Sequence, residues 1–72
     1  MKRVKDGDLK ANIKYYMTLY GVNAVKTAAA VGLSPATFYK RMAYPKSFTF
    51  GDLQNMAALW HISVADLLTE RE

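Results

Sequence analysis

This chain contains no cysteine in its 72 residues, so neither a disulfide nor a thiolate zinc site can brace its fold. It has no apolar run near the ~20 residues that a membrane-spanning helix needs. No apolar segment follows the charges at its N-terminus, as a secretory signal peptide would require. We therefore expect a soluble, cytoplasmic protein with no membrane partner.

Residue types for catalysis and cofactor binding are equally sparse. The chain has a single histidine and no cluster of metal-ligating side chains. It shows no pairing of a nucleophile with a base and no glycine-rich loop that could cradle a phosphate. The sequence thus predicts a protein that is not an enzyme, holds no metal or other cofactor, and acts on no small-molecule substrate.

Charge of one sign is in excess, and it is unevenly distributed. The net charge is +4. Residues 1–48 carry nine lysines and arginines against two aspartates, a balance of +7, whereas residues 49–72 carry one arginine against four carboxylates, a balance of −3. Such a split orients a molecule in the field of a polyanion, although a small protein also needs surface charge for solubility alone.

Start and stop signals divide the chain into a basic, flexible arm over residues 1–7 and one all-α domain over residues 8–72. We expect five helices in that domain and no strand. Their expected bounds are near 9–20, 24–31, 35–43, 50–60 and 64–70.

Capping residues support these boundaries. The single residues expected to cap a following helix are Asp8, Asn23 and Ser34, and the expected capping boxes are Thr49 with Asp52 and Ser63 with Asp66. The residues expected to end helices are Gly21, Gly32 and His61.

Helical spacing also predicts which side chains face inward. They are Leu9, Ile13, Tyr16, Met17 and Tyr20 in the first helix, Thr27, Ala28 and Val31 in the second, and Phe38 and Met42 in the third. Lys10 and Lys14 share a different face of the first helix.

The stretch from Ala28 to Phe38 is the most informative part of the chain. Consecutive alanines let two helix backbones approach closely, and Gly32 takes a positive φ at little cost. Ser34 then caps a helix whose first residue, Pro35, misses no backbone donor. The pattern predicts a helix-turn-helix over about residues 24–43, a unit that in a basic chain presents its second helix to the DNA major groove.

The residues from Gly21 to Leu68 resemble the lambda-repressor-like, Cro-type (XRE) helix-turn-helix family of bacterial and phage regulators. The likeness lies in Gly21-Val22-Asn23, Ala28, Val31-Gly32-Leu33-Ser34, Thr37-Phe38, Leu53, Met56-Ala57, Trp60-His61-Ile62-Ser63 and Leu67-Leu68. It implies a compact five-helix bundle that binds double-stranded DNA in a bacterial or phage-infected cell. It also implies a homodimer on DNA, in which Trp60, Val64, Leu67 and Leu68 are either core residues or part of the dimer face.

Three positions depart from the family's pattern. The family often has glutamine where this chain has Ala24, leucine where it has Thr27, and an aromatic or aliphatic residue where it has Arg41. Met42 lies four residues after Phe38 and can fill the core in place of residue 41. Arg41 would then be free to reach a DNA phosphate.

Residues 35–43 are the expected recognition helix. The residues expected to meet base edges are Pro35, Ala36, Thr37, Tyr39 and Lys40, and those expected to meet phosphates are Asn23, Lys26, Ser34, Arg41, Tyr44 and Lys46. Asn23 and Ser34 serve equally as caps, and Tyr39 and Lys40 could equally belong to an ordinary solvated face. Lys2, Arg3 and Lys5 form either an arm along the DNA or an uninvolved tail.

The sequence therefore predicts a sequence-specific DNA-binding transcriptional regulator, a repressor of the Cro type. The alternative is a small helical protein-interaction module, an adaptor or antitoxin-like protein, that binds an acidic partner and has only nonspecific affinity for DNA. An RNA-binding role lacks the sheet with exposed aromatic residues that it would need.

Overall fold

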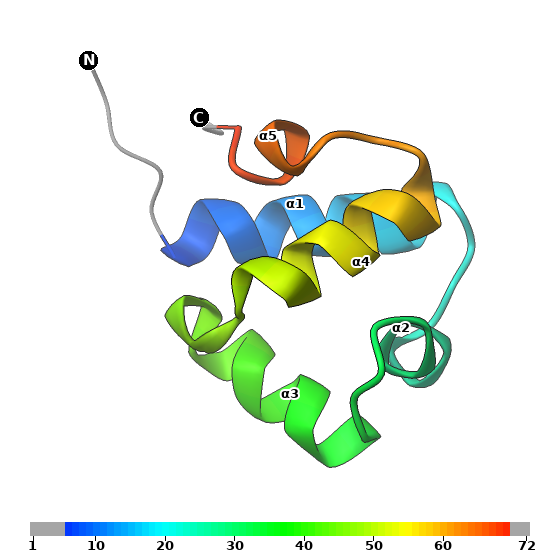
Figure 1. Cartoon of the computed structure of the whole chain (residues 1–72), viewed down its shortest axis with the longest axis vertical. Helices are drawn as coiled ribbons and strands as arrows, with labels where there is room; N and C mark the ends of the chain where they lie inside the picture. The colour runs from blue at the N-terminus through cyan, green and yellow to red at the C-terminus, as the bar shows by residue number, and fades with distance from the viewer. Residues whose placement is uncertain (1–5, 70–72) are drawn as a thin grey trace.

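The structure is a computed structural model in which residues 6–69 are described, with side chains from Asp8 onward. These residues form five α-helices and one short 3-10 helix, and none of them lies in a strand (Figure 1). The elements are α1 (Asp6–Leu19), α2 (Ala24–Ala30), α3 (Pro35–Ala43), η1 (Pro45–Ser47), α4 (Phe50–Trp60) and α5 (Val64–Leu67). The all-α prediction is confirmed.

The predicted bounds hold for α3 and α4, run one residue too far for α2, which ends at Ala30 with Val31 as its cap, and fail at the two ends of the chain. α3 and α4 begin and end where the sequence predicts. α1 begins at Asp6, so Asp8 lies inside the helix, and the prediction that it caps the helix is wrong. An aspartate in the first turn stabilises a helix through the macrodipole without capping it. The first two described residues thus belong to α1, and residues 1–5 of the predicted arm lie outside the described residues.

The helices are arranged around α1 and α4, which cross the middle of the molecule (Figure 1). α5 lies above this pair in the view of Figure 1, and α2 and α3 lie below it. α2 packs against α3 and α4, while α1 packs against α5 and η1. The bundle thus holds the α2–α3 pair at one edge.

α1, α2 and α4 end in the same backbone motif. The residue that ends each helix takes a left-handed conformation, with φ of 65° at Gly21, 76° at Gly32 and 54° at His61. The next residue donates its N–H to a carbonyl five residues earlier, at 2.9 Å in all three turns: Val22 to Met17, Leu33 to Ala28 and Ile62 to Ala57. These are Schellman motifs, which satisfy carbonyls that a helix end leaves free. The predicted helix ends at Gly21, Gly32 and His61 are confirmed.

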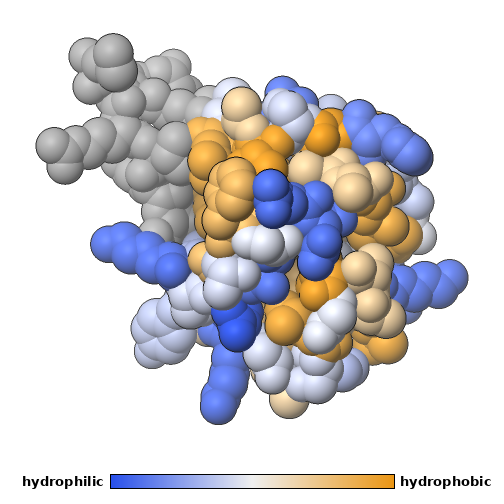
Figure 2. All heavy atoms as spheres, viewed as in Figure 1, coloured by the Kyte–Doolittle hydropathy of each residue, from blue (hydrophilic) through white to orange (hydrophobic). Residues whose placement is uncertain are grey.

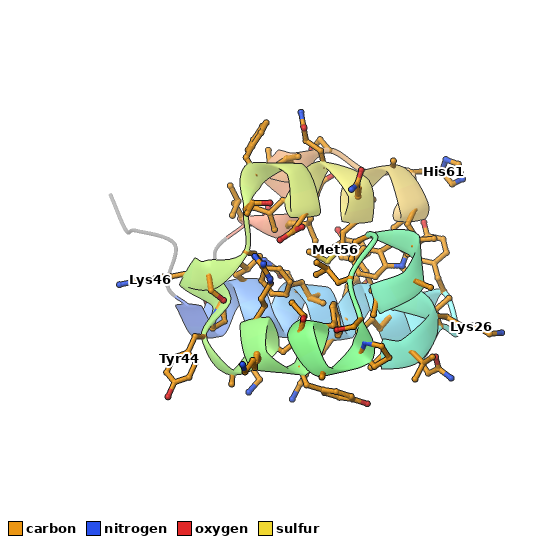
Figure 3. The ribbon with its side chains drawn as sticks, turned by 60° about the horizontal axis from the view of Figure 1, so that its bottom comes forward. Lys26, Tyr44, Lys46, Met56 and His61 are labelled. Carbon is orange, nitrogen blue, oxygen red and sulfur yellow. The ribbon has the colours of Figure 1, made fainter. Side chains whose placement is uncertain are left out.

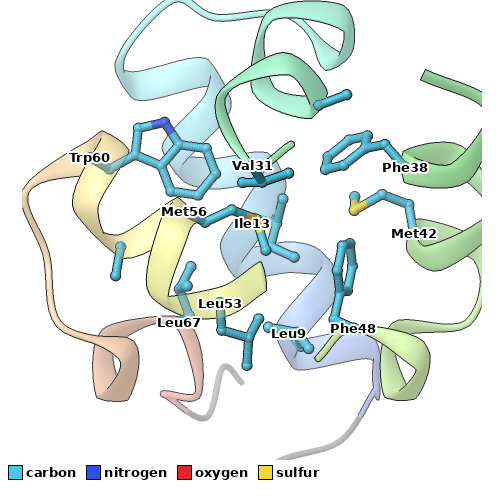
Figure 4. Close-up of a cluster of buried hydrophobic side chains, with 12 residues drawn as sticks. Leu9, Ile13, Val31, Phe38, Met42, Phe48, Leu53, Met56, Trp60 and Leu67 are labelled. Carbon is cyan, nitrogen blue, oxygen red and sulfur yellow. The ribbon is translucent and has the colours of Figure 1, made fainter. Parts of the chain in front are cut away.

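The core fills the space between the helices (Figure 4). Its largest fully buried side chains are Trp60, Phe38, Ile13, Met56 and Leu67. The indole of Trp60 stacks on Tyr16 with ring centroids 5.7 Å apart. Most predicted inward residues are buried or half-buried, but Tyr20 is 49% exposed. Tyr20 lies one residue beyond the end of α1 at Leu19, so helical spacing no longer determines which way its side chain points.

A buried asparagine explains why α5 is shorter than predicted. Asn12 in α1 is fully buried, and its side-chain amide donates to the carbonyl oxygens of Leu67 at 2.8 Å and Thr69 at 2.7 Å. Those carbonyls accept from Asn12, and the chain turns away from the helical path after Leu67. The prediction that this helix extends to residue 70 is therefore wrong.

The repeated left-handed turn generates paired stability predictions. Gly32→Ala should lower the free energy of unfolding by about 1 kcal/mol, because a side chain destabilises positive φ and the site has no other steric conflict. His61→Gly should raise the free energy of unfolding by roughly 0.5 kcal/mol, because it removes that backbone strain.

Urea denaturation followed by circular dichroism measures both changes. Gly51→Ala is the matched control, since Gly51 has no positive φ and alanine there meets only an ordinary contact with Thr49. It should leave stability unchanged or slightly raised. If Gly32→Ala and Gly51→Ala behaved alike, the turn would not constrain the fold in this way.

Candidate nucleic-acid interface

The turn between α2 and α3 determines where α3 begins. The Ser34 hydroxyl accepts a hydrogen bond from the backbone N–H of Thr37 at 3.2 Å and donates to the Thr37 hydroxyl at 2.9 Å. Pro35 occupies the first helical position. At the other helix of the pair, the Asn23 side chain accepts from the backbone N–H of Lys26 at 2.8 Å. The capping roles of Asn23 and Ser34 are confirmed.

Two buried side chains set the orientation of α3 about its own axis. Phe38 and Met42, one turn apart, are 1% and 8% exposed, as predicted. The Phe38 ring packs edge-on against Phe48 with centroids 5.9 Å apart. Because these two side chains are held in the core, packing within the chain alone determines which residues of α3 face solvent.

The outer face of α3 carries the residues predicted to meet base edges. Pro35, Ala36, Tyr39 and Lys40 are exposed, and Thr37 is half-buried. An α-helix with its side chains is about 10–12 Å across, close to the ~12 Å width of the DNA major groove. The exposed side of the nine-residue α3 is thus open to a ligand of that size.

Cationic and phenolic side chains flank this outer face. Figure 3 shows Lys26 and Lys46 pointing outward on opposite sides of the α2–α3 pair, with Tyr44 pointing away from the end of α3. Lys26 and Lys46 are exposed, and Tyr44 is 75% exposed. These three side chains are thus accessible to a ligand on both sides of α3.

Arg41 does not fit the prediction of a free phosphate ligand. Its guanidinium lies 3.1 Å from a carboxylate oxygen of Asp52 and donates to the carbonyl oxygen of Ser47 at 2.7 Å. The same Asp52 oxygen accepts from the backbone N–H of Thr49 in the capping box of α4. Met42 fills the core as expected, but Arg41 links α3 to α4 instead of turning outward to solvent.

The predicted dimer-face residues are divided by the structure. Trp60 and Leu67 are 1% and 0% exposed inside the single chain, so they are core residues and offer no surface to a partner. Val64 and Leu68 are half-buried against that core. Lys2, Arg3 and Lys5 lie outside the described residues.

Two lysines of α1 belong to the same region, which the sequence alone did not indicate. Lys10 and Lys14 line a hollow together with Tyr39 and Ala43 of α3. Their spacing of four residues placed them on one face of α1, but only the fold brings that face to the hollow that α3 also lines. The available signal was the excess positive charge of residues 1–48.

On the face seen in Figure 2, hydrophobic and hydrophilic residues are interspersed, and hydrophilic side chains project at its margins.

Within residues 6–69, no helix is both long and apolar enough to cross a membrane. The described side chains also include no group of three or more histidine, cysteine, aspartate or glutamate residues placed to hold a metal ion.

No protein-family model matches this sequence, and comparisons with curated proteins and with solved structures gave no match.

The pairing of Arg41 with Asp52 predicts unequal roles for the two capping boxes. Asp52→Ala should lower the free energy of unfolding by about 2 kcal/mol, because it leaves a part-buried guanidinium and a backbone N–H without their acceptor. Asp66→Ala removes the equivalent carboxylate from the exposed box of α5 and should cost about 0.5 kcal/mol.

Thermal and urea denaturation of both variants measures the difference. The double variant Arg41→Met with Asp52→Ala should recover part of the loss, since it removes the unpaired charge. Equal losses in the two single variants would contradict a structural role for Arg41.

Proposed function

We propose that this protein is a sequence-specific DNA-binding transcriptional regulator that reads the major groove with α3. The observation that supports it most strongly is the combination of an anchored inner face and a free outer face on a short helix held by a tight turn. Phe38 and Met42 are buried, while Tyr39 and Lys40, which lie between them in the sequence, are exposed. The arrangement agrees with the docking geometry of helix-turn-helix proteins.

Each exposed residue of α3 has a contact that suits its chemistry. The Lys40 ammonium can donate to O6 or N7 of guanine, and the methyl groups of Ala36 and Thr37 can contact thymine. Tyr39 can stack on a sugar or donate to a phosphate. The apolar leading edge at Pro35 and Ala36 favours readout of methyl groups and groove shape over a dense set of hydrogen bonds.

The flanking groups supply affinity that does not depend on sequence. Lys26, Lys46 and Tyr44 would contact phosphates, as would the free backbone amides at the starts of α2 and α3. A second copy bound about one helical turn away would complete an inverted repeat and block access of RNA polymerase to a promoter. Repression by occlusion is the mechanism that follows.

Selection of sequences from random duplex DNA tests this function. The wild-type protein should enrich an approximate inverted repeat. Lys40→Ala should weaken binding to the selected duplex by roughly tenfold and relax the preference at one base pair, because a specific base contact is lost. Lys26→Ala should weaken selected and random DNA alike and reduce the salt dependence by about one phosphate contact.

Gln54→Glu is the matched control, since it also lowers the net charge by one. Gln54 is exposed on α4, which lies on the opposite side of the molecule from α3 in Figure 3. This variant should retain sequence preference with only a small loss of affinity. Absence of any enriched sequence, with affinity that vanishes by ~200 mM salt, would contradict the regulator and support a protein-interaction module instead.

A further inference from the structure

A hollow of about 330 Å³ lies between α1, α2 and α3. Its apolar wall comes from Met17, Phe38 and Met42, of which Phe38 and Met42 are core residues. The space exists because Ala24 and Ala43 line it with single methyl groups. Its volume is at the lower end of the range for small-molecule sites.

Two lysines give this apolar hollow a charged border. Lys10 and Lys14 line it from α1, four residues apart and therefore neighbours on one helix face. Among the described residues, the ion pair found is that between Arg41 and Asp52, so neither lysine is neutralised by a carboxylate there. Like charges four residues apart repel each other, and a bound anion between them would relieve that repulsion.

An apolar interior with a cationic border is complementary to one chemical class. We propose that the hollow binds a small amphipathic carboxylate, with its hydrocarbon chain against Met17 and Met42 and its carboxylate at Lys10 and Lys14. Burial of the chain would supply most of the affinity, and the two lysines would select an anion over a neutral molecule of the same shape.

The position of the hollow couples such a ligand to DNA. This part of the inference rests on the proposed function, because Tyr39 and Ala43 line the hollow and also lie on the exposed side of α3. A bound carboxylate would neutralise Lys10 and Lys14 and place negative charge beside the helix that faces the phosphates. Ligand and DNA should therefore weaken each other's binding by the same factor.

Titration of the isotope-labelled protein with octanoate, without DNA, tests the site by itself. Octanoate should shift the signals of Met17, Ala24 and Ala43 and saturate. Acetate should bind at least about a hundredfold more weakly, because it lacks the methylenes that the hollow would bury. The neutral 1-octanol should bind about fivefold more weakly than octanoate, because it lacks the charge.

Three variants separate the contributions to ligand binding. The double variant Lys10→Gln with Lys14→Gln should weaken octanoate about fivefold and leave 1-octanol unchanged. Ala43→Leu, at an exposed helix position where folding is not at risk, should fill the hollow and weaken both probes by roughly tenfold. Gln54→Glu, which lowers the net charge by one at an exposed position of α4, is the charge control and should leave octanoate binding unchanged.

Signal changes centred on α4 or α5 would overturn the proposed site. Octanoate binding that is insensitive to both Ala43→Leu and the double lysine variant would overturn it as well.

A second experiment measures DNA binding in the presence of each carboxylate. Octanoate should raise the apparent Kd for DNA, while acetate at the same ionic strength should not. If the protein bound octanoate but selected no DNA sequence, the proposed regulatory function would be contradicted and the proposed carboxylate site would remain supported. Octanoate binding without any effect on DNA would overturn the coupling.

Discussion

The left-handed turn at Gly32 is the constraint on which the rest of the candidate interface depends. It ends α2 after Ala30 and lets Leu33 donate back to Ala28, so that Ser34 can cap the next helix almost at once. No L-amino acid with a β-carbon takes this φ of 76° as readily as glycine does. The close succession of α2 and α3 follows from this backbone conformation, and the burial of Phe38 and Met42 then sets which face α3 exposes.

The remaining structure holds α3 in place from its other side. Phe38 and Met42 anchor it to the core, and Arg41 ties it to Asp52 at the start of α4. That one carboxylate caps α4 and pairs with α3, so the orientation of α3 and the integrity of α4 are linked. The exposed residues of α3 are consequently not needed to hold the helix in place, and a surface that binds a ligand specifically needs such rigid support from behind.

Sequence reasoning succeeded where the determining interactions are local. Caps at Asn23 and Ser34 and helix ends at Gly21 and Gly32 are set by residues within one turn, and the structure has them as expected. It also failed locally at Asp8, which lies inside α1, but its other failures arise where a partner on another element decides the outcome. Asn12 contacts Leu67, 55 residues away, and Arg41 pairs with Asp52 of α4, 11 residues away. No local pattern reveals either contact. The approach of Lys10 and Lys14 to α3 depends on packing for the same reason.

The fold gathers many of the lysines of the basic part of the sequence around α2 and α3. The lysines at 26, 40 and 46 lie on or beside the α2–α3 pair, and those at 10 and 14 border the hollow next to α3.

Titration of the isotope-labelled protein with duplex DNA is the most direct test of whether α3 is the element that contacts the bases. The largest signal changes should fall on residues 34–43, with smaller ones at Lys26 and Lys46. Changes concentrated on α4 and α5, with α3 unaffected, would contradict this assignment.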